Sequence, residues 1–171
     1  MHLKPLALAS LLTLLPAAQA VGDAIVINNC PFDAFLNSVG SQIGPEQHLP
    51  ANVGRYSEPF RRDPVSGGIA LKVTRIQGGL PQGAPHTVFA YNLDGGKIWY
   101  DLSNVFGDPF APNPLVLAPS DATCNSIVWP EGRPTAGTHT ENCQENSDVT
   151  LTLCAELPPT TNRTPGAHKS A

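Results

Sequence analysis

The chain has 171 residues, enough for one ordinary domain, with 10 Lys and Arg, 14 Asp and Glu and a formal net charge of -4. Charged residues make up only 14% of it, and 18 Pro and 15 Gly interrupt regular structure throughout, which excludes long helices. A mildly acidic chain without a Lys or Arg run cannot neutralise phosphates, so a nucleic-acid partner is excluded as well.

Residues 1–20 are predicted to be a signal peptide. A weakly basic start precedes the apolar run from Leu6 to Leu15, and Ala18-Gln19-Ala20 has the small-x-small form of a cleavage site. The alternative, an N-terminal helical anchor, is disfavoured because a membrane span needs about 20 apolar residues. We therefore expect a secreted, extracellular protein without membrane insertion.

Four cysteines behind a secretory signal predict two disulfides, for which three pairings are open. They are Cys30, Cys124, Cys143 and Cys154. In the chain-entropy model, a Cys30–Cys154 bond would contribute about 4 to 5 kcal/mol and a Cys124–Cys143 bond about 3, so we favour this nested pairing. A zinc site is disfavoured because the chain has no Cys-x-x-Cys pair, and we expect no metal or cofactor.

Short β-rich runs that alternate with Gly, Pro, Asn and Asp clusters predict an all-β fold. The predicted strands are Ala24 to Asn28, Ala34 to Val39, Ile69 to Ile76, Thr87 to Leu93, Lys97 to Leu102, Ser126 to Trp129 and Asp148 to Cys154. Alternation is clearest where Leu71 and Val73 oppose Lys72 and Thr74, and where Val149, Leu151 and Leu153 oppose Thr150 and Thr152. Asp94-Gly95-Gly96 accepts positive φ and predicts a hairpin. For residues 21–155 we expect a β-sandwich of two antiparallel, disulfide-stapled sheets with little or no helix.

Three segments look different from strands. Pro109 to Pro119 contains four prolines and is expected to be an extended surface loop or a sheet edge. Thr138 to Ser147 lacks Gly and Pro, which allows a short helix there. Residues 156–171 are rich in Thr and Pro and too poor in apolar residues to fold, so we expect a disordered tail, with a glycosylation sequon at Asn162.

Several stretches resemble thaumatin-like proteins. Ile25 to Pro31 is similar to their opening strand, Trp99 to Ser103 followed by Phe106-Gly107 to their acidic-cleft hairpin, and Thr150 to Cys154 to their closing strand. The resemblance is closer to the short fungal secreted thaumatin-like antigens, the yeast-phase-specific protein family. It is carried by Tyr56 to Arg62, Ser66 to Lys72 and Phe89 to Gly95.

The resemblance implies a thaumatin-type β-sandwich without the helical subdomain of the plant members, in which the first and last cysteines bridge. The acidic cleft of the plant members uses an Arg, a Glu and three Asp, and some members bind or slowly hydrolyse β-1,3-glucan. Asp101 matches one of those Asp, whereas Ala90 stands at the Glu position. The neighbouring Asp position falls on Phe106, with Asp108 displaced by two, and the Arg and the last Asp have no match.

Glycoside hydrolysis needs two carboxyl groups about 5 to 9.5 Å apart. Only Asp101 is placed by the resemblance, and its partner would come from Glu58, Asp63, Asp94 or Asp108. A structural role competes at each position. Asp101 could be a local polar group in its strand, and Asp94 is more readily explained by the hairpin turn.

Other residues are candidates for ligand binding. Trp99 and Tyr100 are adjacent in a strand, so they point to opposite faces, and one of them is expected to be exposed as a carbohydrate platform. Glu58, Arg61 and Arg62 could form a sugar-binding or partner-binding surface, or a solvated loop with local ion pairs of little energetic value.

Three functions fit these expectations. The first is a noncatalytic, monomeric secreted protein that binds wall β-glucan or a protein ligand, with a role in germination, morphogenesis or host contact. The second is a weak β-1,3-glucanase built on Asp101. The third is an antigen or adhesin that binds a host cell-surface protein. The missing acidic-cleft residues place catalysis last, and we expect the first function.

Overall fold

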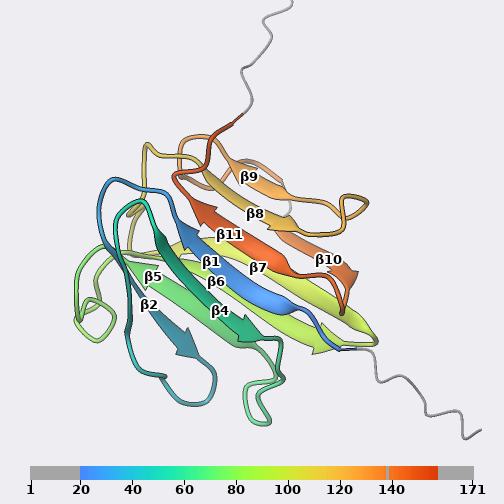
Figure 1. Cartoon of the computed structure of the whole chain (residues 1–171). Coiled ribbons are helices and arrows are strands. Elements are labelled where there is room, and N and C mark those ends of the chain that lie inside the picture. Colours follow the sequence, from blue (N-terminus) through green and yellow to red (C-terminus); the bar gives the residue numbers. More distant parts are fainter. Residues whose placement is uncertain (1–19, 138, 158–171) are drawn as a thin grey trace, which may run out of the picture.

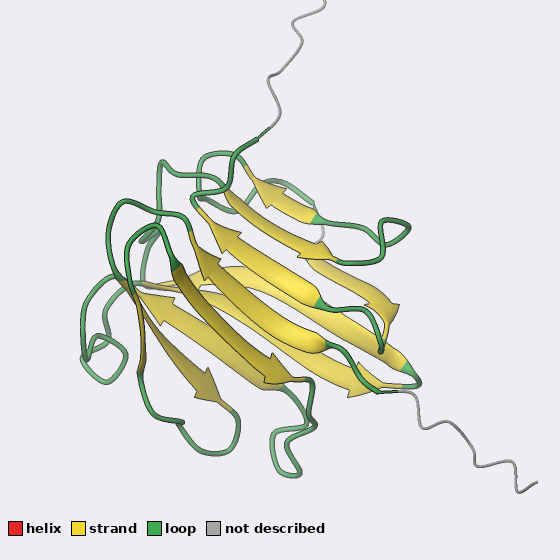
Figure 2. Cartoon of the chain, in the orientation of Figure 1, coloured by secondary structure: helices red, strands yellow, loops and turns green. Residues whose placement is uncertain are grey.

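The computed structural model describes residues 20–137 and 139–157. The predicted signal peptide up to residue 19, the predicted tail from residue 158 onward and Asn162 lie outside the described residues. In the described ranges the protein consists of eleven strands and no helix, as expected for an all-β fold (Figure 2). Among these residues, accordingly, no helix is long and apolar enough to cross a membrane.

The strands form two sheets that lie one in front of the other (Figure 1). The five-stranded sheet has the order β4 (Gly54–Pro59), β1 (Asp23–Asn28), β11 (Val149–Leu153), β8 (Leu115–Pro119) and β9 (Ile127–Trp129). The six-stranded sheet has the order β10 (Thr140–Gln144), β7 (Lys97–Val105), β6 (His86–Asp94), β5 (Ile69–Thr74), β2 (Ala34–Val39) and β3 (Gln47–Leu49). The result is the predicted β-sandwich.

The first and last strands of the fold lie side by side and run in the same direction. Their register pairs Asn28 with Leu153, and this is the one parallel pairing between strands in the described residues. The five-stranded sheet is therefore mixed, whereas antiparallel sheets were expected. Parallel alignment brings the two strand ends together, and the disulfide Cys30–Cys154 joins the chain immediately beyond them.

The core lies between the two sheets. Leu71 and Val73 are fully buried there, as are Leu151 and Leu153, so the predicted alternation of these strands is confirmed. Thr74 departs from it, because it is fully buried where a solvated side chain was expected. Its hydroxyl donates to the carbonyl of Ile76 at 2.8 Å, which satisfies the buried donor.

Two of the three segments that look different from strands in the sequence pair within the sheets. The expectation of a loop or edge for Pro109 to Pro119 was wrong at its end, because β8 pairs with strands on both sides and buries Leu115 and Leu117. A short helix in Thr138 to Ser147 was also wrong. β10 is an edge strand that pairs with β7, and the disulfide from Cys143 to Cys124 ties it to the loop between β8 and β9.

Both strands of the predicted hairpin meet at a two-residue turn. The register pairs Asp94 with Lys97, and the turn residues Gly95 and Gly96 have φ of 61° and 75°. Positive φ at both central positions matches the twist of the flanking strands, and glycine adopts it without steric cost. This hairpin carries Trp99 and Asp101 on the strand that follows the turn.

Candidate ligand-binding cleft

A depression of about 530 Å³, here called the cleft, lies on the face of the six-stranded sheet that points away from the core. Its floor is a row of residues in register, in which Thr140 pairs with Asp101, Asp101 with Ala90, and Ala90 with Ala70. The two alanine side chains are too short to fill the surface between larger neighbours. Those larger neighbours include Trp99, Asp101, Lys72 and Asn92.

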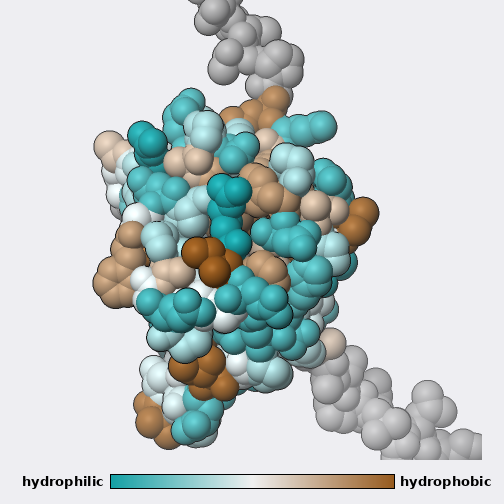
Figure 3. Space-filling view, turned by 90° about the vertical axis from the view of Figure 1, so that its left-hand side faces the viewer, coloured by the Kyte–Doolittle hydropathy of each residue, from teal (hydrophilic) through white to brown (hydrophobic). Residues whose placement is uncertain are grey.

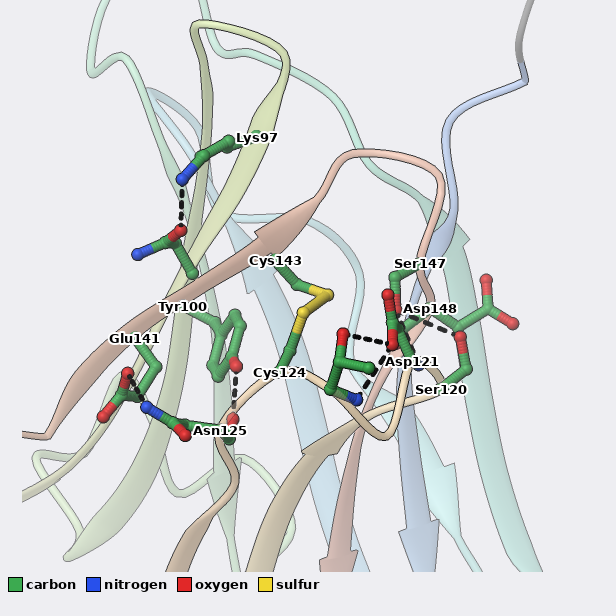
Figure 4. Close-up of a disulfide and its surroundings, with 12 residues drawn as sticks. Lys97, Tyr100, Ser120, Asp121, Cys124, Asn125, Glu141, Cys143, Ser147 and Asp148 are labelled. Atoms are coloured by element: carbon green, nitrogen blue, oxygen red, sulfur yellow. Dashed lines mark hydrogen bonds between the residues drawn. A yellow bond between two sulfur atoms is a disulfide. The ribbon is translucent and has the colours of Figure 1, made fainter.

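Trp99 and Tyr100 point to opposite faces of β7, as predicted. Trp99 is 40% exposed and lines the cleft, whereas Tyr100 is 1% exposed and its ring lies in the core. Figure 4 shows that ring near the disulfide Cys124–Cys143, with its hydroxyl donating to the backbone carbonyl of Asn125. Of the two aromatic candidates, only Trp99 therefore presents its ring to a ligand.

Asp101 is half-buried at the cleft, where one of its oxygens accepts a hydrogen bond from the Thr140 hydroxyl at 3.1 Å. Among the described residues that line the cleft, it is the only acidic one. Its cross-strand neighbour is Ala90, the position at which plant members carry a Glu. The cleft thus presents one carboxylate rather than a pair.

Glu58 lies elsewhere, between the two sheets on β4. Its side chain is 13% exposed and accepts hydrogen bonds from the hydroxyls of Tyr91 at 2.7 Å, Tyr56 at 2.8 Å and Ser38 at 3.1 Å. Tyr91 belongs to β6 and its ring is buried, so Glu58 bridges the five-stranded and six-stranded sheets. This carboxylate is a structural acceptor on the core side, and it does not line the cleft.

Arg61 and Arg62 are both exposed and follow β4. Arg61 donates to the Ser38 hydroxyl at 3.1 Å and lies 3.9 Å from a Glu58 oxygen, so it covers the outer side of that cluster. Arg62 forms no ion pair with any described residue. Neither arginine lines the cleft.

Asp63 connects two loops beside the cleft. One oxygen accepts from the backbone and hydroxyl of Ser41, and the other accepts from the backbone N–H groups of Val65 and Ser66. These backbone hydrogen bonds hold the pKa of the Asp63 carboxyl well below its usual range. Gly40 and Ser66, on these two loops, both line the cleft, so Asp63 shapes one end of it.

The remaining acidic candidates lie at opposite ends of the hairpin. Asp94 is exposed at its turn. Asp108 follows β7 at the other end, where it accepts from the Asn104 amide at 2.8 Å and lies 3.7 Å from Arg133. Neither lines the cleft beside Asp101.

One group of metal-ligating residue types gathers around the second disulfide. Ligand atoms of Asp121, Cys124 and Cys143 all lie within 4.8 Å of one another. Both sulfurs are bonded to each other, and an Asp121 oxygen accepts from the backbone and hydroxyl of Thr123 (Figure 4). Since metals bind thiolates rather than disulfides, this group does not form a metal site.

All three tyrosines of the chain are predicted to resist ionisation in the folded protein. Burial raises the pKa of Tyr56 and Tyr100 to about 12, assisted by the negative charges of Glu58 and Glu141 respectively. Burial and Glu58 also raise the pKa of Tyr91. These pKa values exceed the value of about 10 in the unfolded chain. The neutral, buried tyrosines therefore contribute fully to stability below pH 10, and this contribution is lost as the pH rises toward 12.

Titration followed at 295 nm measures this directly. We expect almost no tyrosinate in the native protein at pH 10.5, and ionisation near pH 10 for the same sample in concentrated urea. A tyrosine that ionises near pH 10 in the native protein would contradict the buried hydrogen bonds of that residue.

Comparison with known proteins agrees with this fold. The family model of the Blastomyces yeast-phase-specific protein matches residues 11–155. The antigenic thaumatin-like protein of Arthroderma benhamiae is 30% identical over 162 residues, which cover 88% of this chain and 81% of that protein. The secreted thaumatin-like protein calA of Emericella nidulans is 28% identical over 162 residues, covering 86% of this chain and 91% of that protein.

A solved structure supports the same assignment. The crystal structure of the protein elicitor MoHrip2 from Magnaporthe oryzae matches with a TM-score of 0.64 and 27% identity, over 78% of this chain and 99% of that one. The resemblance inferred from the sequence motifs is thereby confirmed. The chain belongs to the Blastomyces yeast-phase-specific protein family and is similar to the secreted and antigenic thaumatin-like proteins of fungi.

Proposed function

We propose that this chain is a secreted, noncatalytic protein of the fungal wall or surface that binds β-1,3-glucan in the cleft. The observation that carries the proposal is the exposed Trp99 ring beside Asp101, over a floor of two alanines. The apolar face of a sugar can pack on an indole ring, while a neighbouring carboxylate accepts its hydroxyls. Lys72 and Asn92 add donors at the rim.

The geometry favours binding over hydrolysis. The retaining and the inverting mechanism of glycoside hydrolysis both require a second carboxyl group, about 5 to 9.5 Å from the first. Glu58 lies on the core side, Asp63 is saturated by four hydrogen bonds, and Asp94 lies at the turn. With Asp101 alone at the cleft, a weak β-1,3-glucanase is the less favoured function.

A pull-down on insoluble β-1,3-glucan tests the proposal. We expect the wild-type protein to be retained, and Trp99→Ala to weaken retention about tenfold or more, which corresponds to about 1.4 kcal/mol. Asp101→Ala should also reduce retention. Val128→Ala is the matched control, because Val128 is likewise 40% exposed but lies on β9 of the other sheet.

The supernatant is assayed for released sugar in the same experiment. Wild-type retention without sugar release supports a noncatalytic binder. Sugar release that disappears in Asp101→Asn would instead establish the glucanase function. Equal retention of the wild type and Trp99→Ala would show that glucan does not bind in the cleft.

A further inference from the structure

A second depression lies at the end of the six-stranded sheet where β5 ends and β6 begins. Its volume is about 350 Å³, and it is lined by Arg75, Ile76, Pro85 and Pro109. None of these residues lines the cleft. Pro85 and Ala90 are five residue steps apart, which is roughly 17 Å of extended chain, so the two depressions are separate.

Among the described residues that line this depression, Arg75 is the only charged one. The carbon at the centre of its guanidinium lies 3.7 Å from the centroid of the Phe32 ring, which in turn stacks on Phe110 with centroids 6.4 Å apart. Arg75 is exposed and forms no ion pair or side-chain hydrogen bond with the described residues. Stacking on a ring orients the guanidinium plane while its N–H edges stay available for a carboxylate.

Two large apolar side chains at this end of the sheet are presented to solvent, and Gly107, which follows one of them, faces Pro85 of the lining. Ile76 is 54% exposed, and Phe106, in the loop after β7, is 73% exposed. Phe106 has φ of 60°, a left-handed conformation that is costly for a bulky side chain, and its ring packs edge-on against buried His86 at 6.1 Å. Because the left-handed backbone costs stability and most of the ring is exposed, this position motivates the hypothesis of a binding role for Phe106.

We propose that this end of the sandwich, the Arg75 surface, binds an extended segment of a protein partner that combines an acidic side chain with adjacent aromatic or aliphatic ones. Arg75 takes the carboxylate, the depression takes an apolar side chain, and Phe106 packs against the partner. Charge complementarity supports this occupant, because the nearby Asp108 is engaged by Asn104 and Arg133 and Arg75 has no competing carboxylate among the described residues.

The surface fits a small and reversible contact. Two prolines form half of the lining, so little entropy is lost when it binds. On the side of the molecule that Figure 3 presents, apolar residues occur as separate small patches among polar ones rather than as one continuous face. Contacts of this size belong to the weak, transient class of interfaces.

An NMR titration of the isotope-labelled protein tests the proposal. The probes are two peptides of equal length that differ only in their charged terminal residues, acetyl-Asp-Phe-Leu-Asp-amide and acetyl-Lys-Phe-Leu-Lys-amide. We expect the acidic peptide to shift the amides of Arg75, Ile76 and Phe106 with a dissociation constant near the millimolar range, and the basic peptide to bind at least tenfold more weakly. The amides around Trp99 should not shift.

Variants separate binding from stability. Arg75→Gln should weaken the acidic peptide about tenfold, whereas Arg62→Gln, an exposed arginine without an ion pair among the described residues, should have no effect. Phe106→Asn should weaken binding about tenfold while leaving the Tm unchanged or raised, because asparagine tolerates the left-handed backbone. A purely structural role for Phe106 would lower the Tm instead.

Three results would overturn the proposal. They are no shift at the Arg75 surface with the acidic peptide at several millimolar, equal binding of the two peptides, and unchanged binding in Arg75→Gln. A further arm uses laminarihexaose, a soluble β-1,3-glucan fragment. If it shifts the amides of Arg75 and Phe106, this surface binds carbohydrate and not a protein segment, whereas shifts confined to the cleft leave the proposal standing and bear on the proposed function alone.

Discussion

Removal of the Cys30–Cys154 disulfide is expected to cost about 5 kcal/mol of unfolding free energy. The bond joins residues 124 positions apart. In the chain-entropy model, closing a loop of that length stabilises the folded state by about 5 kcal/mol, which is comparable to the whole unfolding free energy of a marginally stable domain. The bond also lies just beyond the ends of the parallel strands β1 and β11. Strands so distant in sequence pay a large closure entropy before their pairing is formed.

Guanidinium unfolding of the double variant Cys30→Ala/Cys154→Ala measures this effect. Its control is Cys124→Ala/Cys143→Ala, which opens a loop with a sequence separation of 19 and should cost about 3 kcal/mol. We expect the first variant to be largely unfolded at 37 °C and the second to remain folded. A first variant as stable as the second would show that the sheet interface, not the bond, holds β1 against β11.

Glu58→Ala is expected to destabilise the protein by about 3 kcal/mol. The substitution removes the acceptor of three hydroxyl donors, and the buried Tyr91 hydroxyl would be left without a partner between the two sheets. Hydrogen bonds to a charged group contribute about 1.5 to 3 kcal/mol each, and an orphaned buried donor costs about 1 to 3. Relaxation of the more exposed Tyr56 and Ser38 into water limits the total.

A double-mutant cycle with Tyr91→Phe isolates the bond between the sheets. Tyr91→Phe alone should cost about 1 to 2 kcal/mol, and the double variant should cost less than the sum of the two single variants. Glu58→Ala should still bind glucan as the wild type does, since Glu58 does not line the cleft. Loss of retention in a folded Glu58→Ala variant would move the binding site to β4.

All seven predicted strands are present in the structure, and two of them show a clear alternation of apolar and polar side chains. β5 and β11 have this pattern, and their inward residues are aliphatic. β4 was missed because its inward positions hold Tyr56 and Glu58, so the polarity pattern that marks a strand is absent although the chain alternates in space. β8 was missed because its flanking prolines obscure a strand of only five residues.

The candidate cleft was predictable only in part. Trp99 and Asp101 follow from the strand period and from the family motif, and both line the cleft. Neither the strand period nor the family motif predicts that Gly40 and Ser66 line one end of the cleft. They lie on two loops distant in sequence, which the hydrogen bonds of Asp63 hold together. The candidate carboxylates are alike in sequence, but Glu58 faces the core, Asp63 joins two loops and Asp94 lies at a turn.

The sequence alone determined the all-β class and the hairpin at Gly95 and Gly96, because turn residues and alternation act over a few neighbouring positions. It also determined that there are two disulfides, because the number of cysteines and the chain entropy of loop closure can be judged without the fold. The tertiary structure decided the parallel pairing of β1 with β11, the inward direction of Glu58 and the meeting of Arg75 with Phe32. These features depend on which distant strands and loops become neighbours, and that choice is made by the packing of the two sheets as a whole.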